Sequence, residues 1–192
     1  MHTATEPAKK PMTSDDLFAM RPSKKVDRWL FRGELRETKV TRRNPNHSRT
    51  VTYTASLLVS LLRTRPAPRG EIYTGDAYFR LRRDPDTNFG IDIALSSPEQ
   101  KVKTTKKSGY IDGPPVLAVE VLSPYDKVKE LHDKIDEYLE CGVQEIWIID
   151  PYDETLKVYR PDIPLRVLTA SDPFADSPNL PGLKFNIPEL FG

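Results

Sequence analysis

Two segments of the chain repeat their apolar residues with the spacing of a helix. The first follows a turn at residues 44–47 and ends at the proline-rich stretch 65–70; its stripe consists of Val51, Ala55, Leu58 and Leu62. The second is predicted to begin at Ser123-Pro124 and to end at Gly142; its stripe consists of Val128, Leu131, Ile135, Tyr138 and Leu139. A short helix with Thr13 or Ser14 at its cap is also predicted, because two acids follow.

Apolar or alternating runs of strand length lie between and after these helices. Strands are predicted at 71–82, 89–95 and 116–122, and hairpins at 29–36 and 145–160. The polar stretch 96–115 is expected to be a loop, and no strand is predicted after residue 160. Strands interleaved with two long helices favour an α/β or α+β fold, in which helices flank one mixed β-sheet.

The length of 192 residues suits a single domain. Residues 1–12 are expected to be a disordered tail and residues 13–192 the domain. No apolar run approaches the roughly 20 residues that span a bilayer, and the first ten residues lack the apolar core of a secretory signal. The single cysteine, Cys141, excludes an internal disulfide and a cysteine-rich zinc site. A cytoplasmic protein without a membrane partner is therefore expected.

The formal net charge of +1 hides an uneven distribution. Residues 1–110 hold 22 basic and 12 acidic side chains, whereas residues 111–192 hold 7 and 16. Near-neutrality alone would argue against a nucleic-acid partner, but the basic excess is concentrated in 21–49 and in the lysines of the 96–115 loop. Those two segments are the candidates for contacts with a phosphate backbone.

Two carboxylates stand in the middle of otherwise apolar strands. Asp92 lies in the run Phe-Gly-Ile-Asp-Ile-Ala-Leu, and Glu120 in Val-Leu-Ala-Val-Glu-Val-Leu. Burying an ionised carboxylate without a partner is costly, so each acid needs an explanation. A buried ion pair with an arginine is one. The other is a ligand site, for which the small neighbours Gly90, Ala94 and Ala118 would leave room.

Paired carboxylates support several kinds of chemistry. Their hard oxygens suit Mg²⁺ or Mn²⁺, with water and a substrate phosphate completing the coordination shell. Carboxylates that share a proton could instead serve general acid–base hydrolysis. Lys134 flanks the buried stripe of its helix and could reach the acids, although a surface pair with Glu130 fits the spacing equally well.

Several other residues have an ordinary structural interpretation. His47 is interpreted as a residue of the helix cap region, and His132 is expected to face solvent. Trp29 and Trp147 are expected in the core. The acids of the second helix are expected to form a solvated face; they are Asp133, Asp136, Glu137 and Glu140.

The stretch 113–124, Gly-Pro-Pro-Val-Leu-Ala-Val-Glu-Val-Leu-Ser-Pro, continues into a set of spaced residues: Lys134, Tyr138, Gly142-Val143, Glu145, Trp147 and Ile149-Asp150-Pro151. Together they closely resemble the Uma-two family of restriction endonucleases, a branch of the PD-(D/E)XK nuclease superfamily. Met12-Thr13, Gly33-Glu34-Leu35 and the closing segments 180–183 and 189–191 extend the resemblance over about residues 12–191.

The resemblance implies a restriction-endonuclease-like mixed sheet and a metal-dependent phosphodiesterase site. Asp92 and Glu120 match the superfamily's two acids, and Lys134 matches its lysine, which this family carries on the helix. The Val121 carbonyl would be a further metal ligand. Many members carry an acid before the Gly-Glu-Leu motif, and this chain has Trp29 at that position. The resemblance therefore gives less support to an assisting role for Glu34.

The predicted function is therefore a divalent-metal-dependent endonuclease that hydrolyses DNA, with Mg²⁺ or Mn²⁺ as cofactor. Asp92 and Glu120 would hold the metal, and Lys134 would assist the attacking water. Contacts with DNA are assigned to Arg42, Arg43, Lys101, Lys103, Lys106 and Lys107. A homodimer is a further expectation, because cutting both strands of a duplex needs two sites. The alternatives are an inactive nucleic-acid-binding module of the same fold and a metal-independent hydrolase that uses the paired acids.

Overall fold

The computed structural model describes residues 10–40, 44–104, 109–175 and 177–192. The helical elements are α1 (Ser14–Ala19), α2 (Pro45–Arg63), α3 (Val128–Glu140) and the 3₁₀-helix η1 (Ile187–Leu190). The strands are β1 (Val26–Phe31), β2 (Glu34–Lys39), β3 (Ile72–Arg82), β4 (Thr87–Leu95), β5 (Lys101–Thr104), β6 (Gly109–Asp112), β7 (Leu117–Val121), β8 (Glu145–Asp150), β9 (Thr155–Arg160), β10 (Ile163–Leu168), β11 (Pro173–Phe174) and β12 (Phe185–Asn186).

Ten of these strands form one mixed sheet. Its main order is β10-β9-β8-β7-β4-β3-β6-β5, and the β1–β2 hairpin joins it through β4. The pairs β7–β8 and β3–β6 are parallel, and the other pairs are antiparallel. The predicted mixed α/β architecture is confirmed.

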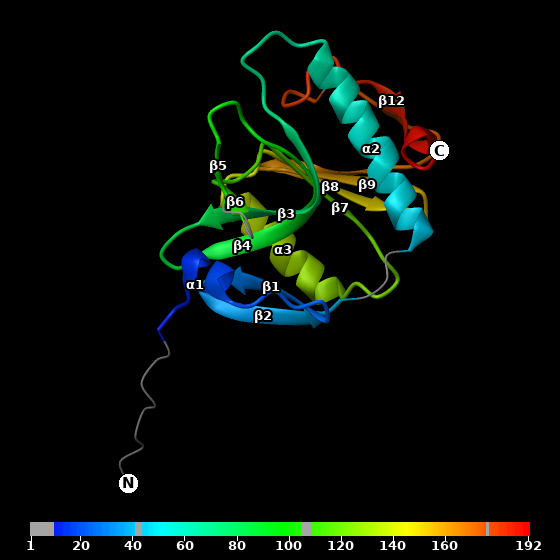
Figure 1. Ribbon diagram of the computed structural model, residues 1–192. Helices are drawn as coiled ribbons and strands as arrows, with labels where there is room; N and C mark the ends of the chain where they lie inside the picture. The colour runs from blue at the N-terminus through cyan, green and yellow to red at the C-terminus, as the bar shows by residue number, and fades with distance from the viewer. Residues whose placement is uncertain (1–9, 41–43, 105–108, 176) are drawn as a thin grey trace.

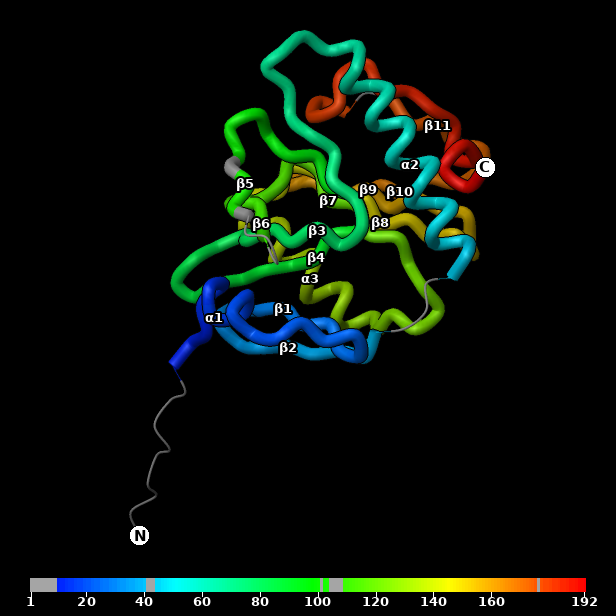
Figure 2. Tube along the Cα trace, in the orientation of Figure 1, coloured from blue at the N-terminus to red at the C-terminus, as the bar shows by residue number. Residues whose placement is uncertain are grey.

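Helices cover the sheet on opposite sides (Figure 1). Helix α2 and the C-terminal segment pack over β7, β8 and β9, and this core includes Leu58, Leu62, Trp147, Phe174 and Leu190. Helix α3 lies on the other side, where Ile135 and Tyr138 pack against Ile146 and Ile148 of β8. The tube in Figure 2 also shows the β1–β2 hairpin lying next to α3.

Helix α2 begins where the sequence predicts. The Asn44 side chain caps it by accepting a 2.9 Å hydrogen bond from the Asn46 amide, and Pro45 occupies the first turn. The buried residues are three or four positions apart from the first turn onward; they are His47, Thr50, Thr54, Leu58 and Leu62. The helix therefore presents its N-terminal turn, with His47, to the interior of the molecule.

Three predictions about secondary structure were wrong. The stretch 96–115 contains β5 and β6, and the chain after residue 160 contains β10, β11 and β12. The second helix begins at Val128, not at Ser123, because Ser123 forms a turn in which its amide and hydroxyl donate to the Asp126 carboxylate at 2.7 and 3.0 Å. Val128 is accordingly 70% exposed and does not join the buried stripe.

Glu137 is not part of a solvated helix face, as the sequence suggested, but is fully buried. Its carboxylate accepts hydrogen bonds from Arg32 at 2.8 Å and from Thr87 at 2.7 Å, and it lies 2.9 Å from Arg82. These partners come from the hairpin turn, β4 and β3. The buried ion pair therefore ties α3 to the β1–β2 hairpin and fixes the separation of two elements that border the site described next.

Candidate active site

Strands β4 and β7 separate at the centre of the sheet. Their antiparallel pairing runs through Leu95↔Leu117 and Ala94↔Ala118 and ends at Ile93↔Val119. One further step in that register would place Asp92 opposite Glu120. Instead, the Asp92 side chain takes up the next amide of β7, because Val121 N–H donates a 2.9 Å hydrogen bond to Asp92 Oδ2.

Asp92 also contacts the N-terminal turn of α2. His47 Nε2 lies 3.3 Å from both oxygens of the Asp92 carboxylate. Both residues are buried, His47 with 5% and Asp92 with 7% of its surface exposed. The Asp92 carboxylate is therefore held between α2, which precedes β4 in the sequence, and β7, which follows it.

Glu120 is held by α3 through one of its two oxygens. Lys134 Nζ lies 2.8 Å from Glu120 Oε1 and 3.3 Å from the Gly90 carbonyl, and the Tyr138 hydroxyl donates to the same Oε1 at 2.5 Å. Lys134 and Tyr138 are one helical turn apart and share a face of α3. Among the described residues no donor bonds Glu120 Oε2. Lys134 thus pairs with Glu120, whereas Glu130 pairs with Lys127.

The environment drives the pKa values of the two acids in opposite directions. Burial raises the pKa of Glu120, and the nearby charge of Asp92 adds to this despite the opposing effect of Lys134. Burial also acts to raise the pKa of Asp92, but His47, the Val121 amide and Lys134 together outweigh it and hold that pKa below its ordinary value. The environment therefore favours the ionised form of Asp92 and disfavours that of Glu120.

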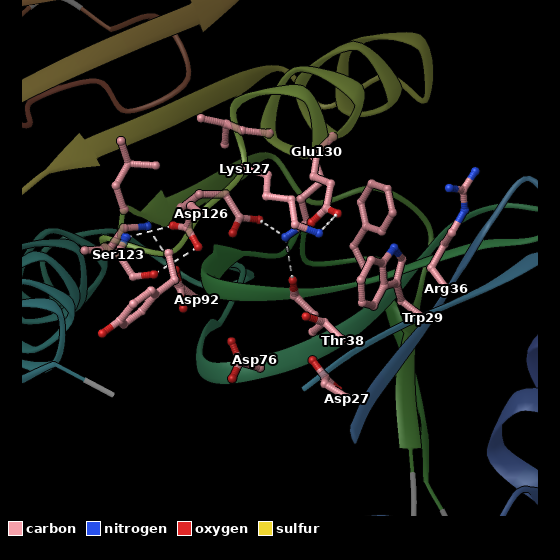
Figure 3. Close-up of a pocket in the computed structure, with 18 of the residues that line it drawn as sticks. Asp27, Trp29, Arg36, Thr38, Asp76, Asp92, Ser123, Asp126, Lys127 and Glu130 are labelled. Carbon is pink, nitrogen blue, oxygen red and sulfur yellow. Dashed lines mark hydrogen bonds and ion pairs between the residues drawn. The ribbon is translucent and has the colours of Figure 1, made fainter. Parts of the chain in front are cut away.

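Both acids line a cavity of about 640 Å³ (Figure 3). Its walls come from the β1–β2 hairpin, the N-terminal turns of α2 and α3, and the separating strands. Acidic residues outnumber basic ones in this lining: Asp27, Glu37, Asp76, Asp92, Glu120, Asp126, Glu130 and Asp133 stand against Arg36, Lys39, Lys127 and Lys134. The described lining is therefore negatively charged overall, which favours cations and neutral groups over bare anions.

The donor set fits a hard divalent cation that keeps part of its own hydration. Asp92 and Glu120 supply carboxylate oxygens, and Glu120 Oε2 receives no hydrogen bond from the described residues. No group of three or more His, Cys, Asp or Glu side chains in the described ranges is arranged to hold a metal. Two protein carboxylates with water and substrate oxygens in the remaining positions are typical of Mg²⁺, not of a closed zinc site.

The other predicted site residues lie elsewhere or outside the described ranges. Glu34 is 71% exposed at its side chain, pairs with Arg36 at 2.9 Å, and does not line the cavity. Lys103 lies on the edge strand β5, 4.0 Å from Asp112 and 5.8 Å from the centre of the Tyr110 ring. The backbone of Lys101 belongs to β5, but its side chain is not described, and Arg42, Arg43, Lys106 and Lys107 lie outside the described residues.

Sequence reasoning missed two residues that touch the paired acids. His47 was interpreted as a cap residue, although its position four residues before Val51, in line with the apolar stripe, was a usable signal. Tyr138 was placed on the apolar stripe, which is correct, but its hydroxyl needs a polar partner when it is buried. Its position four residues after Lys134 could have indicated the same acceptor.

Comparisons with known proteins agree with this picture. A family model described as "Uma2: Putative restriction endonuclease" matches residues 15–188. A crystal structure described as "a putative nuclease belonging to DUF820" from Anabaena variabilis superposes with a TM-score of 0.74. The two chains are 20% identical, and the match covers 94% of this chain and 98% of the other. No curated protein sequence gives a significant match.

At that level of identity the structural match shows a shared fold and nothing further about the reaction. In the described part of the chain no helix is long and apolar enough to cross a membrane. The family model, in contrast, extends over most of the sequence and includes both acids, Lys134 and Tyr138. The chain therefore belongs to the Uma2 family of restriction-endonuclease-like proteins.

Proposed function

We propose that the protein is a divalent-metal-dependent endonuclease that hydrolyses phosphodiester bonds in DNA. Asp92 and Glu120 hold Mg²⁺ or Mn²⁺, with the Val121 carbonyl as an additional oxygen ligand. A divalent ion in this position neutralises charge on the phosphoryl group and lowers the pKa of water. Lys134 orients the attacking water and balances the charge that develops during displacement.

One observation carries this proposal: the two acids enter one cavity from separating strands while Lys134 lies 2.8 Å from Glu120. The raised pKa of Glu120 is compatible with it, because a bound cation would offset the cost of ionising this buried acid beside Asp92. An ordinary buried ion pair would explain Glu120 and Lys134. It would not explain a second carboxylate that lines the same cavity.

The negative cavity lining affects how DNA would approach. A phosphate would meet net repulsion there unless metal ions neutralised the acids, so metal and substrate are expected to bind together. In the sequence, Arg42 and Arg43 lie between Val40 and Asn44, both of which line the cavity, and they are proposed to contact the DNA backbone. The same role is proposed for the lysines 101, 103, 106 and 107.

The test is cleavage of supercoiled plasmid by the full chain with Mg²⁺, Mn²⁺ or a chelator. We expect nicking that requires metal and that is lost in both Asp92→Asn and Glu120→Gln. Binding of Mn²⁺, measured by calorimetry without DNA, should weaken in the same two variants. Glu99→Gln, an exposed acid outside the cavity, is the matched control.

The same experiment separates the two alternatives. DNA binding that is unaffected by a chelator, with no cleavage and no Mn²⁺ binding, would identify an inactive binding module. Turnover that survives the removal of metal would identify a metal-independent hydrolase. Because a break in both strands requires two sites, a homodimer belongs to this proposal, and sedimentation of the protein with and without duplex DNA tests it.

A further inference from the structure

The β1–β2 hairpin presents an aromatic side chain to the cavity. Trp29 and Arg36 are directly opposite each other in the antiparallel register, so their side chains share one face of the hairpin. Both line the cavity that contains Asp92 and Glu120. Figure 3 draws them together on one side of the cavity, with Asp92 on the other. Trp29 is thus partly buried: it packs against the core, as the sequence suggested, but it also lines the cavity.

The indole of Trp29 differs from the other aromatic rings near it. Phe31 is stacked on Phe89 with ring centres 6.2 Å apart, and the Arg36 guanidinium lies 5.6 Å from the centre of the Phe31 ring. Phe89 in turn contacts Tyr138 and lies 5.5 Å from Lys134 Nζ. Trp29 makes no ring contact with the described residues. Trp29 packs against the core beneath the hairpin, and the exposed part of its indole lines the cavity, where another ring could contact it.

The polar groups beside Trp29 suit a neutral ring better than a phosphate. Asp27 and Thr38 are paired in the register next to Trp29 and Arg36, and both line the cavity. Asp27 Oδ1 accepts a 2.8 Å hydrogen bond from the Tyr78 hydroxyl, which fixes the carboxylate. A carboxylate repels phosphate but accepts hydrogen bonds from the amino groups of cytosine, adenine and guanine.

We propose that Trp29 is the stacking platform for a single unpaired nucleobase, with Asp27 as an acceptor for its amino group. The proposal rests on the proposed function and names its substrate class: DNA in which a nucleotide near the scissile bond is displaced or single-stranded. A cavity of about 640 Å³ is large enough for one nucleotide. Stacking on an open aromatic face is the common way in which proteins hold an extruded base.

Tryptophan fluorescence of the full chain tests this directly. Among the two tryptophans, Trp147 is 1% exposed and its indole N–H is bonded to Glu145 at 2.7 Å, so its emission should not respond to a ligand. The titrants are a short single-stranded oligonucleotide, the same sequence as a perfect duplex, and the duplex with one central unpaired nucleotide. All titrations contain Mg²⁺, and the oligonucleotides carry non-hydrolysable linkages, so that metal is present and no cleavage occurs.

We expect the single strand and the interrupted duplex to quench the emission of Trp29, and the perfect duplex to quench it much less. Trp29→Phe should abolish the quenching while retaining most of the affinity. Trp29→Ala should weaken binding of the unpaired substrates by roughly 5- to 150-fold. Tyr152→Ala, an exposed aromatic in the β8–β9 turn, is the matched control and should leave binding unchanged.

The outcomes distinguish this inference from the proposed nuclease activity. Metal-dependent cleavage without quenching, and with the same preference for substrates in Trp29→Ala, would overturn the stacking site and leave the nuclease intact. Equal quenching by the perfect duplex would also overturn it. Quenching by the unpaired substrates without cleavage under any metal would retain the base-binding site and reject the nuclease.

Discussion

The Val121 amide bonds the Asp92 carboxylate at 2.9 Å at the position where β4 and β7 stop pairing. The bond satisfies a β7 amide that the antiparallel ladder would otherwise have bonded to β4. It therefore holds Asp92 beside the gap between the strands and leaves the Val121 amide with a hydrogen-bond partner. The two strands can separate, and the acids can face the same cavity, because this side chain replaces a backbone partner.

Replacement of Lys134 by methionine should separate chemistry from metal binding. Methionine keeps the length and apolar contacts of the stem but removes the charge beside Glu120. We expect cleavage to fall by roughly 10²- to 10³-fold. Binding of Mn²⁺ should be maintained or become tighter, because a competing cation has been removed. Plasmid nicking and calorimetry measure the two effects, and Lys129→Met on the exposed face of the same helix should change neither.

Tyr138→Phe should weaken metal binding without unfolding the protein. The hydroxyl fixes Glu120 Oε1 at 2.5 Å, and its loss leaves the rest of the buried ring in place. Loss of such an outer hydrogen bond commonly reduces metal affinity by roughly 10- to 100-fold. The free energy of unfolding should fall by only about 1 kcal/mol. An unchanged affinity for Mn²⁺, with Tyr152→Phe as the reference, would mean that this hydroxyl does not position Glu120.

Glu137→Ala should cost far more stability than Asp136→Ala, although the two acids are adjacent. Glu137 is fully buried against Arg32 and Arg82, so its removal leaves cations without their buried partner. We expect a loss of about 3 kcal/mol in the free energy of unfolding, against less than about 0.5 kcal/mol for exposed Asp136. Urea denaturation of the two variants provides the comparison. Similar midpoints would show that the network does not hold the hairpin to α3.

Asp112→Asn should lower stability in a pH-dependent way. Burial acts to raise the pKa of Asp112, but hydrogen bonds and charges from Arg80 and Arg83 outweigh it and hold the pKa below the ordinary 3.8. A lowered pKa in the folded state gives stability that is present above the unfolded pKa and is lost as pH falls through the folded pKa. The variant should therefore be less stable than the wild type at about pH 7, and the difference should shrink as pH falls below the ordinary 3.8 and through the folded pKa.

Urea unfolding of both proteins across this range measures the effect. Glu99→Gln, an exposed acid with no ion pair among the described residues, should leave the curve unchanged. A stability difference for Asp112→Asn that persists undiminished in acid would show that packing, not the two arginines, accounts for the loss.

Local patterns predicted much of this structure because the strongest signals are short-range. Acids inside the apolar strands β4 and β7 pointed to a shared cavity, and the period of α2 and α3 predicted much of their buried faces, although Val128 and Glu137 were misassigned. The spacing of Lys134 allowed either a contact with the acids or a surface pair with Glu130, and the family resemblance decided between them. The inferences from strands and helices need only the geometry of a single element.

Features that depend on distant partners could not be read in this way. His47 approaches Asp92 only because α2 crosses the sheet at a particular angle, which is set by packing across the core. The strands β5 and β6 are short and lie in a lysine-rich stretch, and they form because they pair with each other and β6 pairs with β3 near the edge of the sheet. Glu137 has the spacing of a surface acid in the sequence. It is buried because it pairs with Arg32 of the β1–β2 turn and Arg82 of β3, which lie far from it in the chain.

The placement of Lys134 and Tyr138 one helical turn apart also limits the insertions and deletions that this part of the chain can tolerate. A single residue inserted between them would rotate one side chain by about 100° relative to the other, and Glu120 could no longer bond both. A residue inserted in the turn at 123–127 would only lengthen the approach to α3, whose angular setting is fixed by the buried Tyr138. Natural variation in length should therefore accumulate before Val128 and be absent between Lys134 and Tyr138.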